Sequence, residues 1–198
     1  MVLGGGHSVL KWVDEVKESK ADKWAIGSAF NFWWSQGVDP VFYSIHPSAA
    51  ALANIEGVTR AIVATQTDPD VLARLDNVEL FELENGGATS ATYIPALALK
   101  MGYQSITFYG CESNYQNTTH AYMDSGDPYW MVVSCHGERF ITGAEFLMQA
   151  EFLSATLRGD KRFRERSGGL LRAMVRSPRY RITHMSPKVQ AAMEQGNG

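Results

Sequence analysis

The feature of this sequence that most constrains its fold is a regular alternation of short apolar runs with stretches of helical periodicity. Apolar, β-rich runs occupy residues 2–3, 24–29, 41–46, 60–65, 78–83 and 106–110. Helical stretches separate them at 9–20, 30–37, 47–55, 68–75 and 88–102. Strands that alternate with helices at this spacing require right-handed crossovers. The predicted fold class is therefore α/β, Rossmann-like, with a mostly parallel sheet covered by helices on both faces.

The pattern changes beyond residue 129. Residues 130–142 alternate around His136 and Gly137, which predicts a β-hairpin with its turn at these two positions. The remaining elements are expected to be two helices, a last strand and a terminal helix, at 144–158, 168–177, 180–185 and 187–195.

Local signals sharpen two of the predicted helices. Asp68 followed by Pro69 predicts an N-cap and a first helical residue. In the helix near 30–37, Trp33 and Trp34 are adjacent and cannot both face the core, so one is expected to lie at the surface.

Charge divides the chain into two parts. Residues 1–157 carry 8 Lys and Arg against 18 Asp and Glu, whereas residues 158–198 carry 10 against 3. We expect one domain over 1–157, with 158–198 as a basic C-terminal extension packed on it. Such an extension could meet phosphates, nucleic acid, an acidic membrane surface, the acidic body of its own chain, or a neighbouring subunit in a homo-oligomer.

Several classes of protein are disfavoured. Cys111 and Cys135 are the only cysteines, too few for a disulfide framework and without CxxC spacing. The five histidines show no HxxxH or HExxH pair, so we predict no metal site. With no apolar stretch near 18 residues and no basic segment leading an apolar one, we predict neither a transmembrane span nor a secretory signal, and expect a cytoplasmic location.

Ligands of open parallel sheets bind outside the carboxyl ends of the strands. Five loops of this chain belong there: 4–8, 27–31, 45–48, 85–90 and 110–122. In the first, GGGHS, the glycines can bring amide groups to an anion at a helix start, although a plain tight turn with Ser8 as N-cap is an equal alternative. The candidate binding residues in these loops are Gly4, Gly5, Gly6, Ser8, Ser28, Asn31, His46, Gly87, Thr89, Ser90, Cys111 and Glu112.

The loop at 110–122, GCESNYQNTTHAY, buries almost nothing and concentrates reactive groups. Histidine titrates near neutral pH and tyrosine donates a strong hydrogen bond to a leaving phosphate. We therefore predict that Tyr115, His120 and Tyr122 act at a phosphoryl or glycosyl centre. The alternative is an ordinary polar surface loop.

Four stretches together resemble the bacterial motility-associated-factor glycosyltransferase domain: GGGHSVL, NGGATSATYIPALALKMGYQSITFYGCESNY, THAY and GERFITGAEFLMQAEFL. That superfamily also contains archaeal 6-hydroxymethylpterin diphosphokinases and is similar to bacterial lipooligosaccharide sialyltransferases. The resemblance covers roughly residues 1–157. The chain departs from the family pattern in GGGHS, which lacks an asparagine and a proline, and at His46, where Asp or Asn is common.

The resemblance implies a nucleotide site. It places a cytidine monophosphate (CMP) group at Gly4 to Ser8, at His46 before Pro47, and at Thr89 with Ser90. It also implies that Tyr115, with His120 or Tyr122, stabilises the departing phosphate. His136 is a second candidate for the catalytic histidine.

Three functions follow from these observations. The first is a transferase that moves sugar from a nucleotide donor, a CMP-linked nonulosonic acid, to a hydroxyl of an acceptor glycan or protein, with no tightly bound cofactor. The second is diphosphate transfer from ATP to a pterin-like alcohol, with Mg²⁺ held by carboxylates such as Glu112, Asp124 and Asp127. The third is a non-catalytic nucleotide or nucleic-acid binding module.

Overall fold

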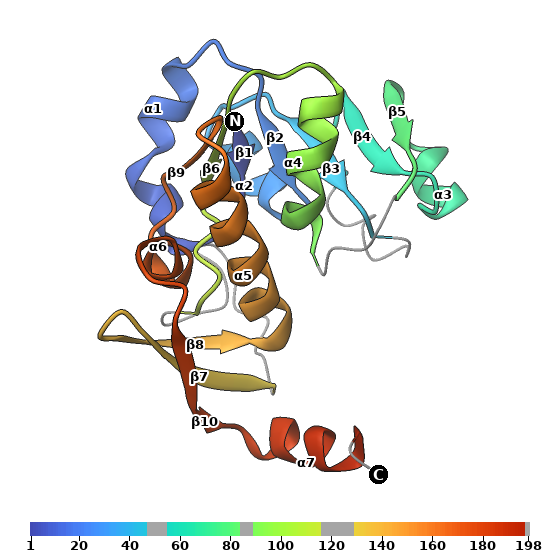
Figure 1. Cartoon of the computed structure of the whole chain (residues 1–198). Coiled ribbons are helices and arrows are strands. Elements are labelled where there is room, and N and C mark those ends of the chain that lie inside the picture. The colour runs from blue at the N-terminus through green and yellow to red at the C-terminus, as the bar shows by residue number, and fades with distance from the viewer. Residues whose placement is uncertain (47–54, 84–88, 116–128, 197–198) are drawn as a thin grey trace.

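The computed structural model describes residues 1–46, 55–83, 89–115 and 129–196. They form a seven-stranded parallel sheet and a smaller three-stranded antiparallel sheet (Figure 1). The predicted α/β fold class is confirmed. The large sheet contains β1 (Val2–Leu3), β2 (Trp24–Ile26), β3 (Val41–Ser44), β4 (Ala61–Ala64), β5 (Val78–Phe81), β6 (Ile106–Tyr109) and β9 (Phe163–Glu165).

The strand order of the large sheet is β5-β4-β3-β2-β1-β6-β9. The chain enters at β1 and builds outward through β2, β3, β4 and β5. It then returns to the other side of β1 to add β6 and β9, and all neighbouring pairs are parallel. The direction of building therefore reverses between β1 and β6, which is the position where doubly wound sheets leave a crevice.

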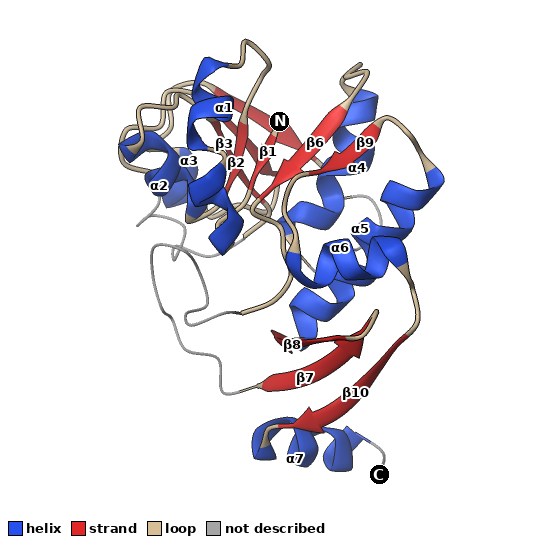
Figure 2. Ribbon diagram, turned by 90° about the vertical axis from the view of Figure 1, so that its left-hand side faces the viewer, coloured by secondary structure: helices blue, strands red, loops and turns tan. Residues whose placement is uncertain are grey.

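Helices cover both faces of this sheet (Figure 2). One face carries η1 (His7–Lys11), α1 (Val13–Glu18), α2 (Ala29–Ser35) and α3 (Pro69–Leu72). The opposite face carries α4 (Ser90–Lys100), α5 (Ala144–Gly159) and α6 (Gly169–Arg176).

Successive strand residues enter different cores. Leu3 and Phe42 pack on the α1 and α2 side, while Val2 and Tyr43 pack on the α4 side. A strand buried on both faces needs a continuous apolar run rather than an alternating one, which is why these short runs identified the sheet.

Two local predictions are confirmed. Asp68 caps α3, since its carboxylate accepts a hydrogen bond from the Asp70 amide at 2.8 Å. Trp33 is fully buried and its indole donates to the Gly4 carbonyl at 3.1 Å, whereas Trp34 is 41% exposed.

Other predictions need correction. The expected helix at 9–20 is divided into η1 and α1, and Gly6, rather than Ser8, precedes η1 as its cap. Strand β9 was not predicted, because Phe163 is the only apolar residue in its sequence FRE. The helix expected at 47–55 lies almost entirely outside the described residues.

The predicted hairpin forms the second sheet. It comprises β7 (Trp130–Cys135) and β8 (Glu138–Gly143), and β10 (Tyr180–Met185) pairs with β7 on the outer side. His136 and Gly137 form the turn, with φ of 51° and 80°, as a tight hairpin requires. A third core joins this sheet to α5 and α6 and includes Val189 of α7 (Pro187–Gly196).

Candidate functional site

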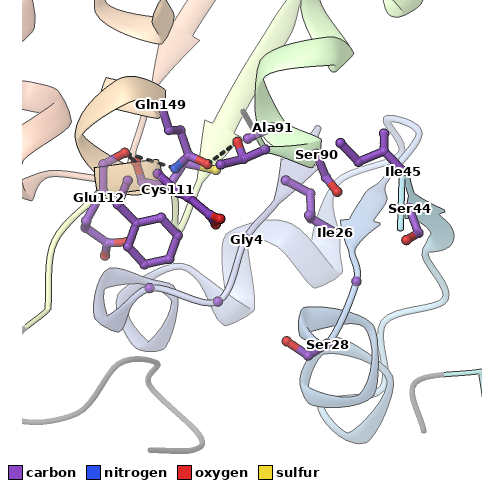
Figure 3. Close-up of a pocket in the computed structure, with 18 of the residues that line it drawn as sticks. Gly4, Ile26, Ser28, Ser44, Ile45, Ser90, Ala91, Cys111, Glu112 and Gln149 are labelled. Atoms are coloured by element: carbon purple, nitrogen blue, oxygen red, sulfur yellow. Dashed lines mark hydrogen bonds between the residues drawn. The ribbon is translucent and has the colours of Figure 1, made fainter. Parts of the chain in front are cut away.

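A cleft of about 360 Å³ opens at the carboxyl edge of the large sheet, beside the point where the direction of building reverses. Figure 3 shows Gly4, Ser28, Ser44 and Ser90 around the same space, with Glu112 and Gln149 at its other side. The cleft is lined by Gly4, Gly5, Gly6, Ile26, Gly27, Ser28, Ser44, Ile45, His46, Thr89, Ser90, Ala91, Gly110, Cys111, Glu112, Ser113, Asn114, Glu145, Phe146 and Gln149.

The glycines after β1 allow the ends of β1 and β6 to approach closely. A Cβ atom on Gly4 would overlap the carbonyl oxygen of Gly110. The Gly4 amide donates to the Tyr109 carbonyl at 2.7 Å, and the Gly6 amide donates to the Gly110 carbonyl at 2.9 Å. These two amides are therefore engaged within the protein by backbone carbonyls at the end of β6.

Glu112 occupies the start of η1. Its Oε1 accepts a hydrogen bond from the Ser8 amide, and its backbone carbonyl accepts one from the Leu171 amide at 3.0 Å. The side chain is buried, and burial raises the pKa of the carboxyl group, while hydrogen bonds from Ser8 act in the opposite direction. Glu112 thus supplies, from the chain itself, an acceptor for a backbone amide at the start of η1.

The start of α4 faces the cleft and is held by a hydrogen-bonded chain of side chains. Thr89 is the N-cap residue, and its hydroxyl donates to Gln149 Oε1 at 2.7 Å. Gln149 Nε2 in turn donates to Ser113 Oγ at 2.9 Å. Gln149 is itself buried, so this chain fixes α4, α5 and the segment after β6 relative to one another.

The segment after β6 is anchored at each residue. Ser113 adopts a left-handed φ of 59°, a conformation that concentrates at functional sites. Asn114 Oδ1 accepts from the Leu170 amide at 2.8 Å. The Tyr115 amide donates to the Ile141 carbonyl at 2.7 Å, and the Tyr115 ring lies 5.5 Å from the ring of Phe146, centroid to centroid.

The opposite wall comes from the ends of β2 and β3. The amide of Gly27 donates to the Tyr43 carbonyl at 2.9 Å, and Ser28 follows as the N-cap residue before α2. Ser44 Oγ accepts from the His46 amide at 3.1 Å. Hydroxyl groups from three separate segments, at Ser28, Ser44 and Ser90, thereby border one cavity.

The structure brings most of the predicted binding residues together. The lining includes Gly4, Gly5, Gly6, Ser28, His46, Thr89, Ser90, Cys111 and Glu112. Four predicted residues do not line the cleft: Ser8, Asn31, Tyr115 and His136. Gly87, His120 and Tyr122 lie outside the described residues.

The reasons for these four exceptions are structural. Ser8 faces a different cavity, and Asn31 is exposed on α2. His136 is exposed at the β7–β8 turn, and neither residue of this turn lines the cleft. Tyr115 packs against Phe146, which does line the cleft.

Sequence reasoning missed the contribution of α5, which provides Glu145, Phe146 and Gln149 to the lining. The sequence signal was the stretch GERFITGAEFLMQAEFL, which carried part of the family resemblance but was given no site role.

Within the described ranges, no three His, Cys, Asp or Glu side chains gather where they could hold a metal ion. None of the helices in the same part of the chain combines the length and apolar character needed to cross a bilayer. Both cysteines are free and buried, and burial raises the pKa of the Cys111 thiol.

The fold and the cleft together define a doubly wound α/β protein with a cleft at its topological switch point, the position where ligands of this fold class bind. No protein-family model and no curated protein matches the sequence. Among solved structures, the chain is similar to a MAf glycosyltransferase from Magnetospirillum magneticum AMB-1, with a TM-score of 0.65 and 15% sequence identity.

That likeness covers 96% of this chain and 36% of the other protein. The chain therefore spans about a third of the length of the glycosyltransferase it matches. At this identity the likeness establishes the fold alone: the chain shares the α/β fold of part of that glycosyltransferase.

Proposed function

We propose that this chain binds a nucleotide-activated sugar in the cleft and transfers the sugar to a hydroxyl group of an acceptor glycan or protein. We further propose a CMP-linked nonulosonic acid as the donor. The observation that carries the proposal is the cleft itself, in which hydroxyl groups and glycines from four strand ends meet at the switch point of a glycosyltransferase-like fold.

The character of the lining favours a donor whose phosphate linkage carries a single charge. No Lys or Arg is among the described residues that line the cleft. The phosphate linkage of a CMP-linked nonulosonic acid carries one charge, separate from the carboxylate of its sugar, whereas the diphosphate of a nucleoside diphosphate sugar carries two charges on adjacent groups and is commonly balanced by a metal ion or basic side chains. The start of α4, with the hydroxyl of Ser90, offers a positive helix end and a hydrogen-bond donor for a single charge.

In the proposed reaction, the acceptor oxygen forms a bond to the anomeric carbon of the sugar. The bond between that carbon and the phosphate oxygen breaks, and CMP departs with its electron pair. The acceptor proton passes to a general base, for which we propose His120, because His136 lies outside the lining. Tyr115 and Tyr122 are proposed to donate hydrogen bonds to the departing phosphate.

The first test is a thermal-shift panel of CMP, CDP, ATP and GTP, each with and without Mg²⁺. A ligand that binds only the folded chain raises its melting temperature. We expect CMP to stabilise the protein without metal, and the shift to be reduced in Ser28→Ala and Ser90→Ala. Ser35→Ala is the matched control, because this exposed hydroxyl on α2 lies outside the cleft and bonds to the Phe32 carbonyl.

Two results would redirect the proposal. Stabilisation by ATP that depends on Mg²⁺ would favour diphosphate transfer to an alcohol. No shift with any nucleotide would reject a nucleotide site in the cleft. If CMP binds, release of CMP from an activated nonulosonic acid should be lost in His120→Ala and strongly reduced in Tyr115→Phe, with the melting temperatures of both variants unchanged.

A further inference from the structure

A second cavity lies on the far side of Glu112 from the cleft. It has a volume of about 390 Å³ and lies between η1 and the segment from the end of β9 through α6. We call it the basic cavity. Its lining consists of His7, Ser8, Lys11, Trp12, Glu112, Glu138, Arg166, Ser167, Gly168, Gly169, Arg172, Ala173 and Arg176.

Two of its arginines are held in place by neighbouring side chains. Arg172 donates to Glu165 through Nε at 2.6 Å and through a terminal nitrogen at 3.2 Å. The guanidinium of Arg166 lies 5.0 Å from the ring centre of Trp12, and its Nε is 4.0 Å from Glu15 Oε1. Both arginine side chains remain about half exposed, at 51% for Arg166 and 43% for Arg172.

The other two cations have no acidic partner in the described part of the chain. No ion pair is found there for Lys11, on η1, or for Arg176, at the end of α6. Both side chains belong to exposed residues that line the cavity. Within the lining, four cations therefore face two carboxylates, Glu138 and the buried Glu112. Because Arg166 and Arg172 already pair with Glu15 and Glu165, Lys11 and Arg176 are the lining cations that a ligand can meet without breaking an ion pair among the described residues.

We propose that the basic cavity binds the phosphate group of a phosphorylated small molecule. Guanidinium groups present several donors in a planar fork that matches phosphate oxygens, and the partners of Arg166 and Arg172 restrict how these forks can turn. The volume suits a ligand of small-molecule size, since such pockets range from roughly 300 to 1,000 Å³. The site does not depend on the function of the cleft, with which it shares only Glu112 among its lining residues.

The test is calorimetric titration of the nucleotide-free chain with inorganic phosphate, glucose 6-phosphate, glucose and glucuronate. We expect both phosphates to bind, glucose to show no binding, and glucuronate to bind more weakly than glucose 6-phosphate. Inorganic phosphate binding as tightly as the sugar phosphate would identify a free anion as the ligand. Tighter binding of the sugar phosphate would identify a phosphorylated metabolite.

The decisive variant is Lys11→Gln combined with Arg176→Gln, which removes the two cations without partners and leaves the Arg166 and Arg172 contacts intact. We expect phosphate affinity to fall about tenfold or more, the usual consequence of losing one charge-assisted hydrogen bond. The matched control is Lys161→Gln with Arg164→Gln, which removes the same charge from exposed residues of the basic segment outside the cavity.

Three outcomes would overturn the proposal. They are no phosphate binding, unchanged affinity in the Lys11/Arg176 variant, and an equal loss in the control variant. The last would indicate diffuse attraction to the basic segment. Binding of a single-stranded oligonucleotide that depends equally on both charge pairs, with no binding of the small phosphates, would likewise assign the segment to nucleic acid.

Discussion

The two cavities on either side of Glu112 are built in opposite ways. The cleft is bordered by backbone and hydroxyl groups at the ends of parallel strands, and its described lining contains no Lys or Arg. The basic cavity is bordered by long charged side chains from η1, the segment after β9, and α6. The shape of the cleft therefore depends on how closely the strand ends approach one another. The charge of the basic cavity depends instead on side chains that can be replaced without moving the backbone.

Gly4→Ala should have the largest effect on stability and on the cleft. The added methyl group overlaps the Gly110 backbone, which, unlike a side chain, cannot rotate away. We expect a loss of about 3 kcal/mol in the free energy of unfolding and loss of CMP binding. Gly159→Ala is the control, since the space around Gly159 in α5 is open, and it should be neutral or stabilising by about 0.5–1 kcal/mol. Urea unfolding measures both; equal stability of the two variants would show that the strand ends can separate freely.

Gln149→Leu should lower the affinity of the cleft for CMP and leave the affinity of the basic cavity for phosphate unchanged. The change removes the acceptor of the Thr89 hydroxyl and the amide donor to Ser113, at a cost of about 1–2 kcal/mol. CMP affinity should fall because the start of α4 loses its support, while phosphate affinity of the basic cavity should stay constant. Titration of each ligand into Gln149→Leu and into the exposed control Gln104→Leu measures this. A parallel loss of both affinities would mean that the cavities are not independent.

Glu112→Gln should change the stability of the fold by a smaller amount, and the change should depend on pH. Because burial raises the pKa of Glu112 in the folded state, ionisation is less favourable there than in the unfolded chain. Wild-type stability is therefore expected to fall as pH rises from about the ordinary value of 4.5 through the raised pKa. The glutamine variant lacks this term, so its advantage in melting temperature should be largest at neutral pH and vanish in acid. A difference that grows in acid would contradict the assignment.

The difference between the cavities also explains what could be predicted. The cleft follows from the order of apolar runs, because the carboxyl ends of parallel strands must share one edge, and nine predicted binding residues do line it. The basic cavity needs residues 7–12 to meet residues 166–176, and no local pattern encodes that contact. Strand β9, which brings them together, has an ordinary polar sequence and pairs with β6 because of its tertiary position.

Glu112 shows, at a single residue, the same limit on what the sequence can predict. Its position after β6 indicated a ligand-binding role, yet its carboxylate is bonded to the Ser8 amide within the chain. Sequence spacing placed the glycine turn and the acidic residue at one edge correctly. The sequence did not show that the Glu112 carboxylate would accept a hydrogen bond from this turn. That bond requires Gly6 and Glu112 to approach so closely that a Cβ atom on Gly6 would overlap the carboxylate.

One pairing in the second sheet has a consequence for engineering. Ile141 pairs with Val132 on one side and with Tyr115 on the other. Tyr115 and Val132 therefore flank a single strand, on the order of 10 Å apart, which is twice the spacing between neighbouring strands. The sequence between these two anchors, which includes His120 and Tyr122, begins and ends at the same strand. Exchanging it for a short designed turn while both anchors stay paired would therefore remove the proposed general base, His120, and the proposed hydrogen-bond donor, Tyr122, in one step.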